Sequence, residues 1–243
     1  MFKNKKAVIF DMDGTLIDSV GLWNEIDQVL IEQLGRVRID LDVIQKQRDT
    51  KLREYAQAEN PYLEYGRFLA GRYGSEQSAE EVIQLRYEIS EAYLRERVDY
   101  KPGVPVFLKR LQEAGIRLAI ASTTKRNNMD VYRLANRNIR TKAPIDETFA
   151  LVLTREDASE MKPHPEIYER AMKQLGVTPE ECLIFEDSLI GMEAAHRSGA
   201  ETVAIWDAYS EKERAAIRAL ADHNFANYAE ALEVLEKELQ EIL

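Results

Sequence analysis

The chain has 243 residues, enough for one large domain or for a core domain with a smaller insertion. It is 45% apolar and 31% charged, and its formal net charge of −10 argues against a nucleic-acid partner, because such a surface repels phosphate backbones. The lone cysteine, Cys182, excludes an internal disulfide, and the lack of a long apolar run predicts no signal peptide and no membrane partner, so a cytoplasmic protein is expected.

The first predicted element is a buried parallel strand over residues 7–10, a short apolar run that leads into Asp-Met-Asp-Gly-Thr. Ligands of open α/β folds bind beyond the carboxyl ends of the strands, so Asp11 and Asp13, two residues apart, are expected to face one crevice. Gly14 lets the chain turn sharply there. Two neighbouring carboxylates repel each other unless a cation or a shared proton relieves them. The alternative is a polar loop or a helix cap formed by Asp13 and Thr15.

Residues 18–98 are expected to form an all-helical insertion between the first and second strands. They carry apolar residues at helical spacing and show no strand pattern. The chain is expected to return to the core near Pro102-Gly103, since these residues mark a break. The predicted domains are therefore a helical cap over 18–98 and an α/β core over 1–17 and 99–243.

Two groups of side chains in the insertion are candidates for contact with a substrate. The basic group would bind an anionic part of the substrate, or it is a solvated helical face with ion pairs. The aromatic group would line a sugar or nucleoside pocket, or it is the core of the insertion itself. The basic residues are Arg48, Lys51 and Arg53, and the aromatic ones are Tyr62, Tyr65, Phe68 and Tyr73.

From about residue 100 onward, short apolar runs alternate with segments of helical periodicity. This alternation predicts a parallel sheet with helices on both faces. The last helix is expected to pack on the core, with partner binding as the alternative. The predicted strands cover 118–121, 149–153, 182–185 and 203–206, and the predicted helices cover 106–114, 167–175, 190–198 and 228–243.

Hydroxyl groups and a lysine follow in positions where an anion would bind. Ser122, Thr123 and Thr124 come directly after a predicted strand, where a hydroxyl and the amides of a helix N-terminus form an anion site. The alternative is an ordinary serine or threonine cap. Lys162 precedes Pro163 at a predicted helix entry, so its ammonium group either sits in the crevice as a point charge or is solvated on the surface.

A second acidic pair, Glu186 and Asp187, ends another predicted strand. Two acidic pairs at equivalent strand ends suit Mg²⁺, which prefers few carboxylates together with waters and a phosphate. Zinc is disfavoured, because the three histidines are scattered along the chain. The alternative for the second pair is an N-cap made by Asp187 or Ser188.

Together and in this order, the four motifs resemble those of the haloacid dehalogenase superfamily over essentially the whole chain. The helical insertion, the Lys-Pro-x-Pro pattern from Lys162 and the Glu-Asp-Ser-x-x-Gly-x-x-Ala-Ala pattern over 186–195 are typical of its β-phosphoglucomutase-like phosphatase subgroup. The resemblance implies a three-layer, Rossmann-like parallel-sheet core with an inserted all-helical cap that sets the choice of substrate.

The resemblance also implies a role for each motif. Asp11 matches the nucleophile, which forms an aspartyl-phosphate. Asp13 matches the general acid and base, a role that a dehalogenase does not need because halide leaves unprotonated. Ser122, with the amide of Thr123, would hold phosphoryl oxygens, and Lys162 would stabilise the charge of nucleophile and phosphate.

The metal implied by the resemblance is Mg²⁺. Its ligands would be the Asp11 carboxylate, the Asp13 backbone carbonyl and the Asp187 carboxylate, with Glu186 as a further ligand or acting through water. The implied activity is hydrolysis of a small phosphorylated metabolite, a sugar or polyol phosphate, by a monomer or weak dimer.

Two other functions remain open. The first is a sugar phosphomutase. β-Phosphoglucomutase carries a histidine in its first cap helix, whereas the corresponding place here, around Trp23, has none. The second is a catalytically silent module that binds a phosphorylated ligand. The complete set of motif residues speaks against it, because a binding module has no need of both Asp11 and Asp13.

Overall fold

The computed structural model describes residues 1–55 and 58–240, and the side chain of Arg53 lies outside this description. The chain forms two compact units, one of residues 1–19 and 98–243 and the other of residues 20–97. The boundaries predicted from the sequence lie one or two residues away, and the role of the smaller unit as a cap stays a prediction. No helix among the described residues is long and apolar enough to cross a membrane.

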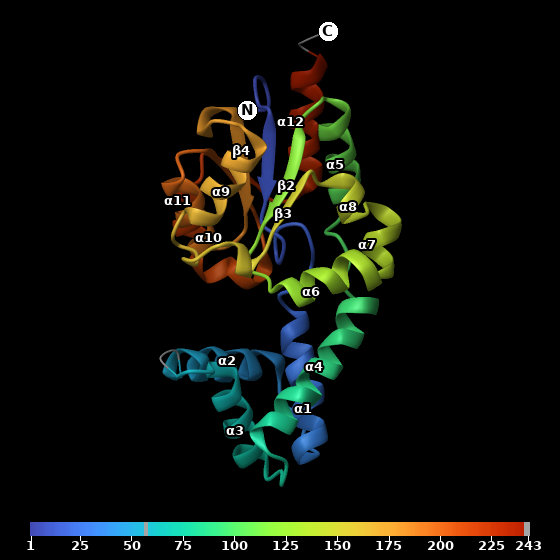
Figure 1. The fold of residues 1–243 in the computed structure, drawn as a ribbon, viewed down its shortest axis with the longest axis vertical. Coiled ribbons are helices and arrows are strands. Elements are labelled where there is room, and N and C mark those ends of the chain that lie inside the picture. The colour runs from blue at the N-terminus through green and yellow to red at the C-terminus, as the bar shows by residue number, and fades with distance from the viewer. Residues whose placement is uncertain (56–57, 241–243) are drawn as a thin grey trace. The chain divides into compact units, whose positions relative to one another are not determined.

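The larger unit contains a six-stranded parallel sheet in the order β3-β2-β1-β4-β5-β6 (Figure 1). β1 lies between β2 and β4, and Phe10 at its end is in register with Ile120 on one side and Phe185 on the other. The segments that follow these three strands therefore meet at one edge of the sheet. The strands are β1 Ala7–Phe10, β2 Arg117–Ala121, β3 Leu151–Leu153, β4 Cys182–Glu186, β5 Glu201–Ile205 and β6 His223–Phe225.

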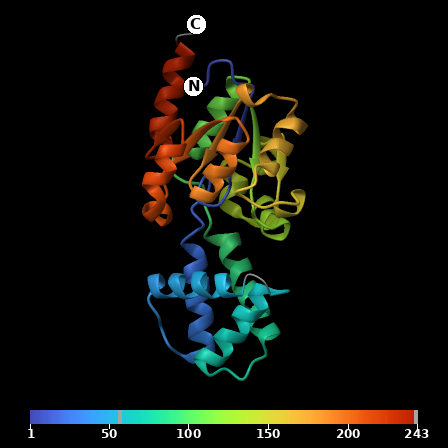
Figure 2. The ribbon, with the colours of Figure 1, turned by 90° about the vertical axis from the view of Figure 1, so that its left-hand side faces the viewer.

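Helices cover both faces of the sheet, so the predicted three-layer α/β fold is confirmed. α5 and α12 lie on one side, and α9, α10 and α11 lie on the other (Figures 1 and 2). The helices of this unit are α5 Val104–Glu113, α6 Arg126–Asp130, α7 Arg137–Lys142, α8 Ile145–Thr148, α9 Glu166–Leu175, α10 Leu189–Arg197, α11 Arg214–Leu220 and α12 Tyr228–Gln240, with a π-helical turn at Val131–Ala135.

Side chains of β1 alternate between the two layers, as the pleat requires. Ile9 packs in the cluster that includes Tyr168 and Met172 of α9. Phe10 packs edge-on against Phe107 of α5, with ring centroids 6.4 Å apart, and the Phe107 ring lies 5.4 Å from that of Tyr228 in α12. This burial on both faces explains why residues 7–10 form a continuous apolar run.

The C-terminal helix packs on the core, as predicted. Tyr228, Ala231 and Leu235 are buried, and the Tyr228 hydroxyl donates to the Thr15 carbonyl at 3.1 Å. Residues 241–243 of the predicted helix lie outside the described part of the chain.

Several predicted boundaries in the larger unit were wrong. The strand predicted from 149 begins at Leu151, because α8 ends at Thr148 and Phe149 is its C-cap. The strand predicted over 203–206 covers Glu201–Ile205, and Trp206 lies beyond it with 42% of its surface exposed. β6 was missed because its three residues contain one apolar side chain. The short helices between 126 and 148 were missed because they are polar and interrupted.

Among its described residues, the smaller unit contains helices and the loops that connect them, and no strand. Ser78 starts α4 with a reciprocal capping box, in which its side chain accepts from the Glu81 amide while the Glu81 carboxylate accepts from the Ser78 amide. Asn60 caps α3, whose first residue is Pro61. The helices are α1 Leu22–Gly35, α2 Leu41–Glu54, α3 Pro61–Tyr73 and α4 Ala79–Glu96.

A buried ion network holds these helices together. The fully buried Asp27 carboxylate of α1 accepts from Arg86 Nε at 2.6 Å and from Arg48 Nη1 at 3.1 Å. Arg48 also donates to the Asn24 side chain at 2.8 Å. Lys51, in contrast, pairs with Glu54 on its own helix. Arg48 is thus neither a solvated surface group nor free for a ligand within this unit.

The aromatic candidates also differ in whether they are buried in the core of the helical unit or partly exposed. Tyr65 is fully buried and stacks on Phe68, with centroids 6.3 Å apart, so it belongs to the core of the helical unit. Tyr73 donates to the Gln47 side chain at 3.2 Å, and Tyr62 is 38% exposed. The pocket interpretation therefore does not hold for Tyr65.

We expect Arg48→Ala to destabilise the protein far more than Lys51→Ala. The first change removes a hydrogen-bonded cation from a buried carboxylate, at a cost of about 2–3 kcal/mol. The second removes a surface pair of one helix, which has little measurable effect. Urea unfolding followed by far-UV circular dichroism checks this, and similar unfolding midpoints for the two variants would show that the Asp27 network contributes no stability.

Candidate active site

The predicted site residues of the larger unit gather at the carboxyl edge of the sheet. Asp11 follows β1, Ser122 follows β2, and Glu186 is the last residue of β4. Their convergence follows from the strand order, since β1 is hydrogen-bonded to both β2 and β4. Lys162 reaches the same place from the loop before α9.

Lys162 is buried and bridges two carboxylates. Its Nζ lies 2.6 Å from Asp11 Oδ1 and 2.7 Å from Glu186 Oε1, and it donates to the Ala121 carbonyl at 3.2 Å. Burial lowers the pKa of Lys162, but the Asp11 and Glu186 carboxylates outweigh this and raise it above its ordinary value. The side chain is therefore a fixed ammonium group, and the interpretation as a solvated surface lysine was wrong.

Glu186 has hydrogen bonds on both carboxylate oxygens. Oε1 accepts from Lys162 and from the Tyr168 hydroxyl at 2.5 Å, and Oε2 accepts from the Asp187 amide at 3.1 Å and the Ser188 hydroxyl at 3.2 Å. A Cβ at position 191 would overlap this carboxylate, so glycine is required there. Glu186 thus orients Lys162, and its contact with Tyr168 was not predicted from the sequence.

The oxygens of Asp11, Glu186 and Asp187 lie within 4.8 Å of one another and form a buried acidic cluster. Thr15 Oγ1 donates to Asp187 Oδ1 at 2.8 Å. Gly14 has a φ of +86°, and a Cβ there would overlap the Asp187 carboxylate. The predicted N-cap of α10 is made by Ser188, whose side chain accepts from the Gly191 amide, and this leaves Asp187 in the cluster.

The electrostatics of this cluster fit a divalent cation. Burial raises the pKa of Asp11 to about 7 even though Lys162 opposes the shift. Burial, together with the charges of Glu186 and Asp11, also raises the pKa of Asp187 well above its ordinary value. One ammonium group therefore does not offset three carboxylates, and an oxygen-rich set of this kind suits Mg²⁺.

We expect Mg²⁺ to raise the melting temperature more at about pH 8 than at about pH 5. The pKa of the Asp11 carboxyl is near 3.8 in the unfolded chain and about 7 in the folded protein. Its contribution to the free energy of unfolding is therefore complete below pH 3.8 and is lost as the pH rises through 7. A cation bound by the ionised carboxylates restores that loss at high pH only. Melting curves recorded with Mg²⁺ and with a chelator at both pH values measure this difference. Equal shifts of the melting temperature at the two pH values would contradict the expectation.

The Asp13 carboxyl, which is not part of the acidic cluster, accepts hydrogen bonds from three hydroxyl groups. Ser19 donates to Oδ1, Thr124 donates to Oδ2, and the Tyr132 hydroxyl donates to Oδ1 at 3.2 Å. Thr124 belongs to a predicted motif, but its contact with Asp13 was not predicted. Ser19 and Tyr132 were missed, because neither of these two residues lies at a predicted strand end or helix entry.

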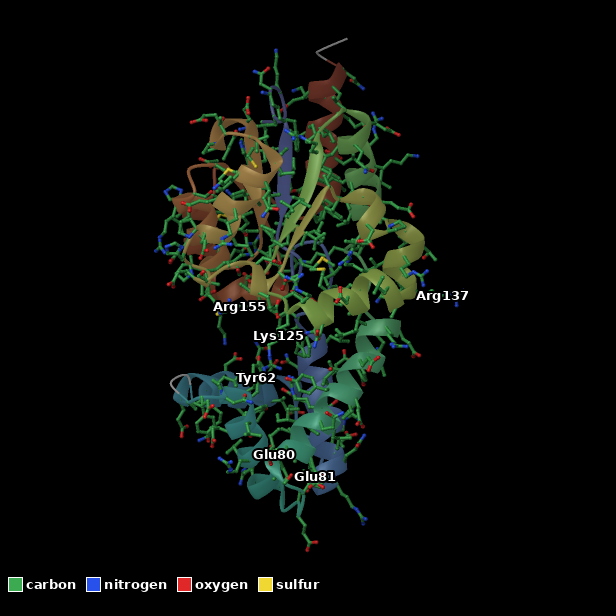
Figure 3. All side chains as sticks on the ribbon, viewed as in Figure 1. Tyr62, Glu80, Glu81, Lys125, Arg137 and Arg155 are labelled. Carbon is green, nitrogen blue, oxygen red and sulfur yellow. The ribbon has the colours of Figure 1, made fainter. Side chains whose placement is uncertain are left out.

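The segment after β2 carries Ser122 and Thr123, and their predicted role in binding an anion stays a prediction. α6 begins at Arg126 without a side-chain cap and continues directly into the π-helical turn Val131–Ala135, so the alternative of a serine or threonine cap was wrong. Ser122 is buried, and its Oγ accepts from the Thr124 amide at 3.2 Å, whereas Thr123 is exposed. Lys125 and Arg155, labelled in Figure 3, extend from the loops after β2 and β3.

The chain is similar in sequence to a known family of hydrolases. The family model for haloacid dehalogenase-like hydrolases matches residues 8–205. YhcW of Bacillus subtilis (strain 168), which has a provisional phosphatase name, is 33% identical over 200 residues, covering 82% of this chain and 83% of YhcW. The phosphorylated carbohydrates phosphatase of Thermotoga maritima is 28% identical over 198 residues, covering 82% of this chain and 83% of that protein.

The fold also matches a solved structure. A Thermotoga maritima protein described provisionally as a β-phosphoglucomutase superposes with a TM-score of 0.75 at 24% identity, covering 98% of this chain and all of the other. At this level of identity, the match concerns the fold.

Proposed function

The chain belongs to the haloacid dehalogenase-like hydrolase family and is a phosphatase of that family, and from this premise we propose that it hydrolyses a small phosphorylated metabolite, a sugar or polyol phosphate, through an aspartyl-phosphate at Asp11. The observation that carries this proposal is the buried contact between Lys162 Nζ and Asp11 Oδ1, which lie 2.6 Å apart. Asp11 lies two residues before Asp13 in the chain. The contact presents a carboxylate beside a fixed positive charge, as attack on a phosphate ester requires.

In the first step, an Asp11 carboxylate oxygen attacks phosphorus. The bond between phosphorus and the ester oxygen breaks, and that oxygen takes a proton from the Asp13 carboxyl. Lys162 offsets the repulsion between the carboxylate of Asp11 and the anionic ester, and its double contact with Asp11 and Glu186 keeps it in place without reorganisation.

In the second step, Asp13, now ionised, takes a proton from water as the water oxygen attacks phosphorus. The bond between phosphorus and the Asp11 oxygen breaks, which releases inorganic phosphate and restores the carboxylate. Ser122 and the amide of Thr123 would hold phosphoryl oxygens beside β2. Asp11, Asp187 and the Asp13 carbonyl, with Glu186 alongside, would hold Mg²⁺, which when bound supplies positive charge for the phosphoryl group.

The substrate class follows from two arguments. A leaving group that departs unprotonated needs no acid, so the acid role proposed for Asp13 favours alkyl esters such as those of sugars and polyols. The Thermotoga maritima relative named a phosphorylated carbohydrates phosphatase supports the same class. We propose that the helical unit, residues 20–97, selects among these esters.

The test is phosphate release from a panel of hexose, pentose and polyol phosphates, nucleotides and an aryl phosphate, each with Mg²⁺ and with a chelator. Magnesium-dependent release that is fastest for a sugar or polyol ester supports the proposal. Conversion of glucose 1-phosphate into glucose 6-phosphate, primed by a bisphosphate and without phosphate release, identifies a mutase. Ligand binding without any turnover identifies a silent binding module.

A further inference from the structure

Tyr132 touches the proposed acid and base but belongs to none of the four motifs. Its hydroxyl donates to Asp13 Oδ1 at 3.2 Å, and its side chain is fully buried. Ser19 donates to the same oxygen, and Thr124 donates to the other. Three hydroxyl groups from three separate segments therefore fix the orientation of one carboxyl group.

The backbone around Tyr132 is unusual. The residue lies in the π-helical turn Val131–Ala135, where the Asn136 amide donates to the Val131 carbonyl, five residues earlier, at 2.8 Å. Within this turn Tyr132 is fully buried, whereas Leu134 is 63% exposed. Hydrophobicity alone would bury the leucine and expose the phenol. Turns of this kind are rare and recur at functional sites.

We propose that Tyr132 is a positioning residue that holds the Asp13 carboxyl in the orientation needed for proton donation. This inference rests on the proposed function, in which Asp13 protonates the leaving oxygen. Proton transfer requires the donor within hydrogen-bond reach and in line with its acceptor, so small rotations of the carboxyl are costly. Ser19 and Thr124 are buried as well, and Tyr132 adds a third donor whose oxygen is carried by a fully buried ring.

The test compares Tyr132→Phe with the unchanged enzyme on two substrates, using kcat/KM, which reports steps up to departure of the leaving group. One substrate is an alkyl phosphate, whose leaving oxygen needs a proton, and the other is an aryl phosphate with an acidic phenol, which does not. We expect Tyr132→Phe to lower kcat/KM about tenfold for the alkyl ester, the size of one hydrogen bond to a charged group. The aryl ester should be affected less than about twofold by the same reasoning.

Tyr100→Phe is the matched control. Tyr100 is also a buried tyrosine of the larger unit, and its hydroxyl donates to the Ala143 carbonyl at 2.6 Å without touching Asp13. Tyr100→Phe should change kcat/KM only slightly, and by the same factor for the two esters. Equal losses on the two esters in Tyr132→Phe, or no loss on either, would overturn the role of Tyr132.

Asp13→Asn separates this inference from the proposed function. If Asp13→Asn lowers kcat/KM much more for the alkyl than for the aryl ester, the proposed acid is correct and Tyr132→Phe tests the positioning residue alone. If Asp13→Asn shows no such difference, the proposed role of Asp13 fails, and the role of Tyr132 fails with it.

Discussion

Asp11→Asn should lower kcat for phosphate release by about 10⁴-fold or more, the scale seen when a nucleophile is removed from an enzyme. The amide has nearly the same shape as the carboxylate but carries no negative charge and cannot form the acyl phosphate. The substitution also removes one carboxylate from the acidic cluster, so Mg²⁺ should bind less tightly. The measurement is steady-state phosphate release at saturating Mg²⁺ and substrate.

An exposed aspartate of α2 provides a matched control. Asp49→Asn removes one carboxylate from an exposed position in α2, where its oxygen lies 3.8 Å from Arg48 Nε. It should leave kcat within about twofold, because surface pairs of this kind contribute little. Near-normal turnover by Asp11→Asn would show that the reaction does not pass through this carboxylate.

Lys162→Met should abolish turnover and also destabilise the fold. Lys162 is buried between Asp11 and Glu186, so its loss leaves two carboxylates facing each other without a cation. Removing one partner of a buried pair costs about 3–5 kcal/mol. The loss of turnover should be about 10³-fold or more, since the charge acts directly on the nucleophile and phosphate. Thermal unfolding and phosphate release measure the two effects.

The double variant Lys162→Met with Asp11→Asn distinguishes repulsion from lost packing. Replacing the carboxylate by an amide removes one of the two facing charges, so the double variant should be more stable than Lys162→Met alone while remaining inactive. If the two changes lowered stability additively, the loss in Lys162→Met would come from packing, and the electrostatic account of this site would be wrong.

Much of the fold and of the site could be predicted because the relevant signals are local. β1 is a continuous apolar run because both of its faces are covered, and Asp11 and Asp13 follow it directly. Lys162 was harder to place, because a lysine before a proline is usually a surface residue. Its buried position depends on Glu186, whose own placement depends on the order of strands in the sheet.

The groups that orient the site could not be predicted from local patterns. Tyr168 lies on the apolar side of α9, where a tyrosine is normally a core residue, and its contact with Glu186 arises only when α9 packs on the sheet. Tyr132 depends on a π-helical turn that has no sequence signature. Such contacts are tertiary, and periodicity and spacing do not report them.

The most direct test of the covalent mechanism uses Asp13→Ala with an aryl phosphate. The phenol leaves without a proton, so the aspartyl-phosphate forms, but the base that activates water is missing, so it should accumulate. We predict a burst of about one equivalent of phenol per chain, with the phosphate retained on the protein as a hydroxylamine-labile group, and no burst when Asp11→Asn is added. Phosphate release that keeps pace with phenol from the first turnover, with no label on the chain, would contradict the account.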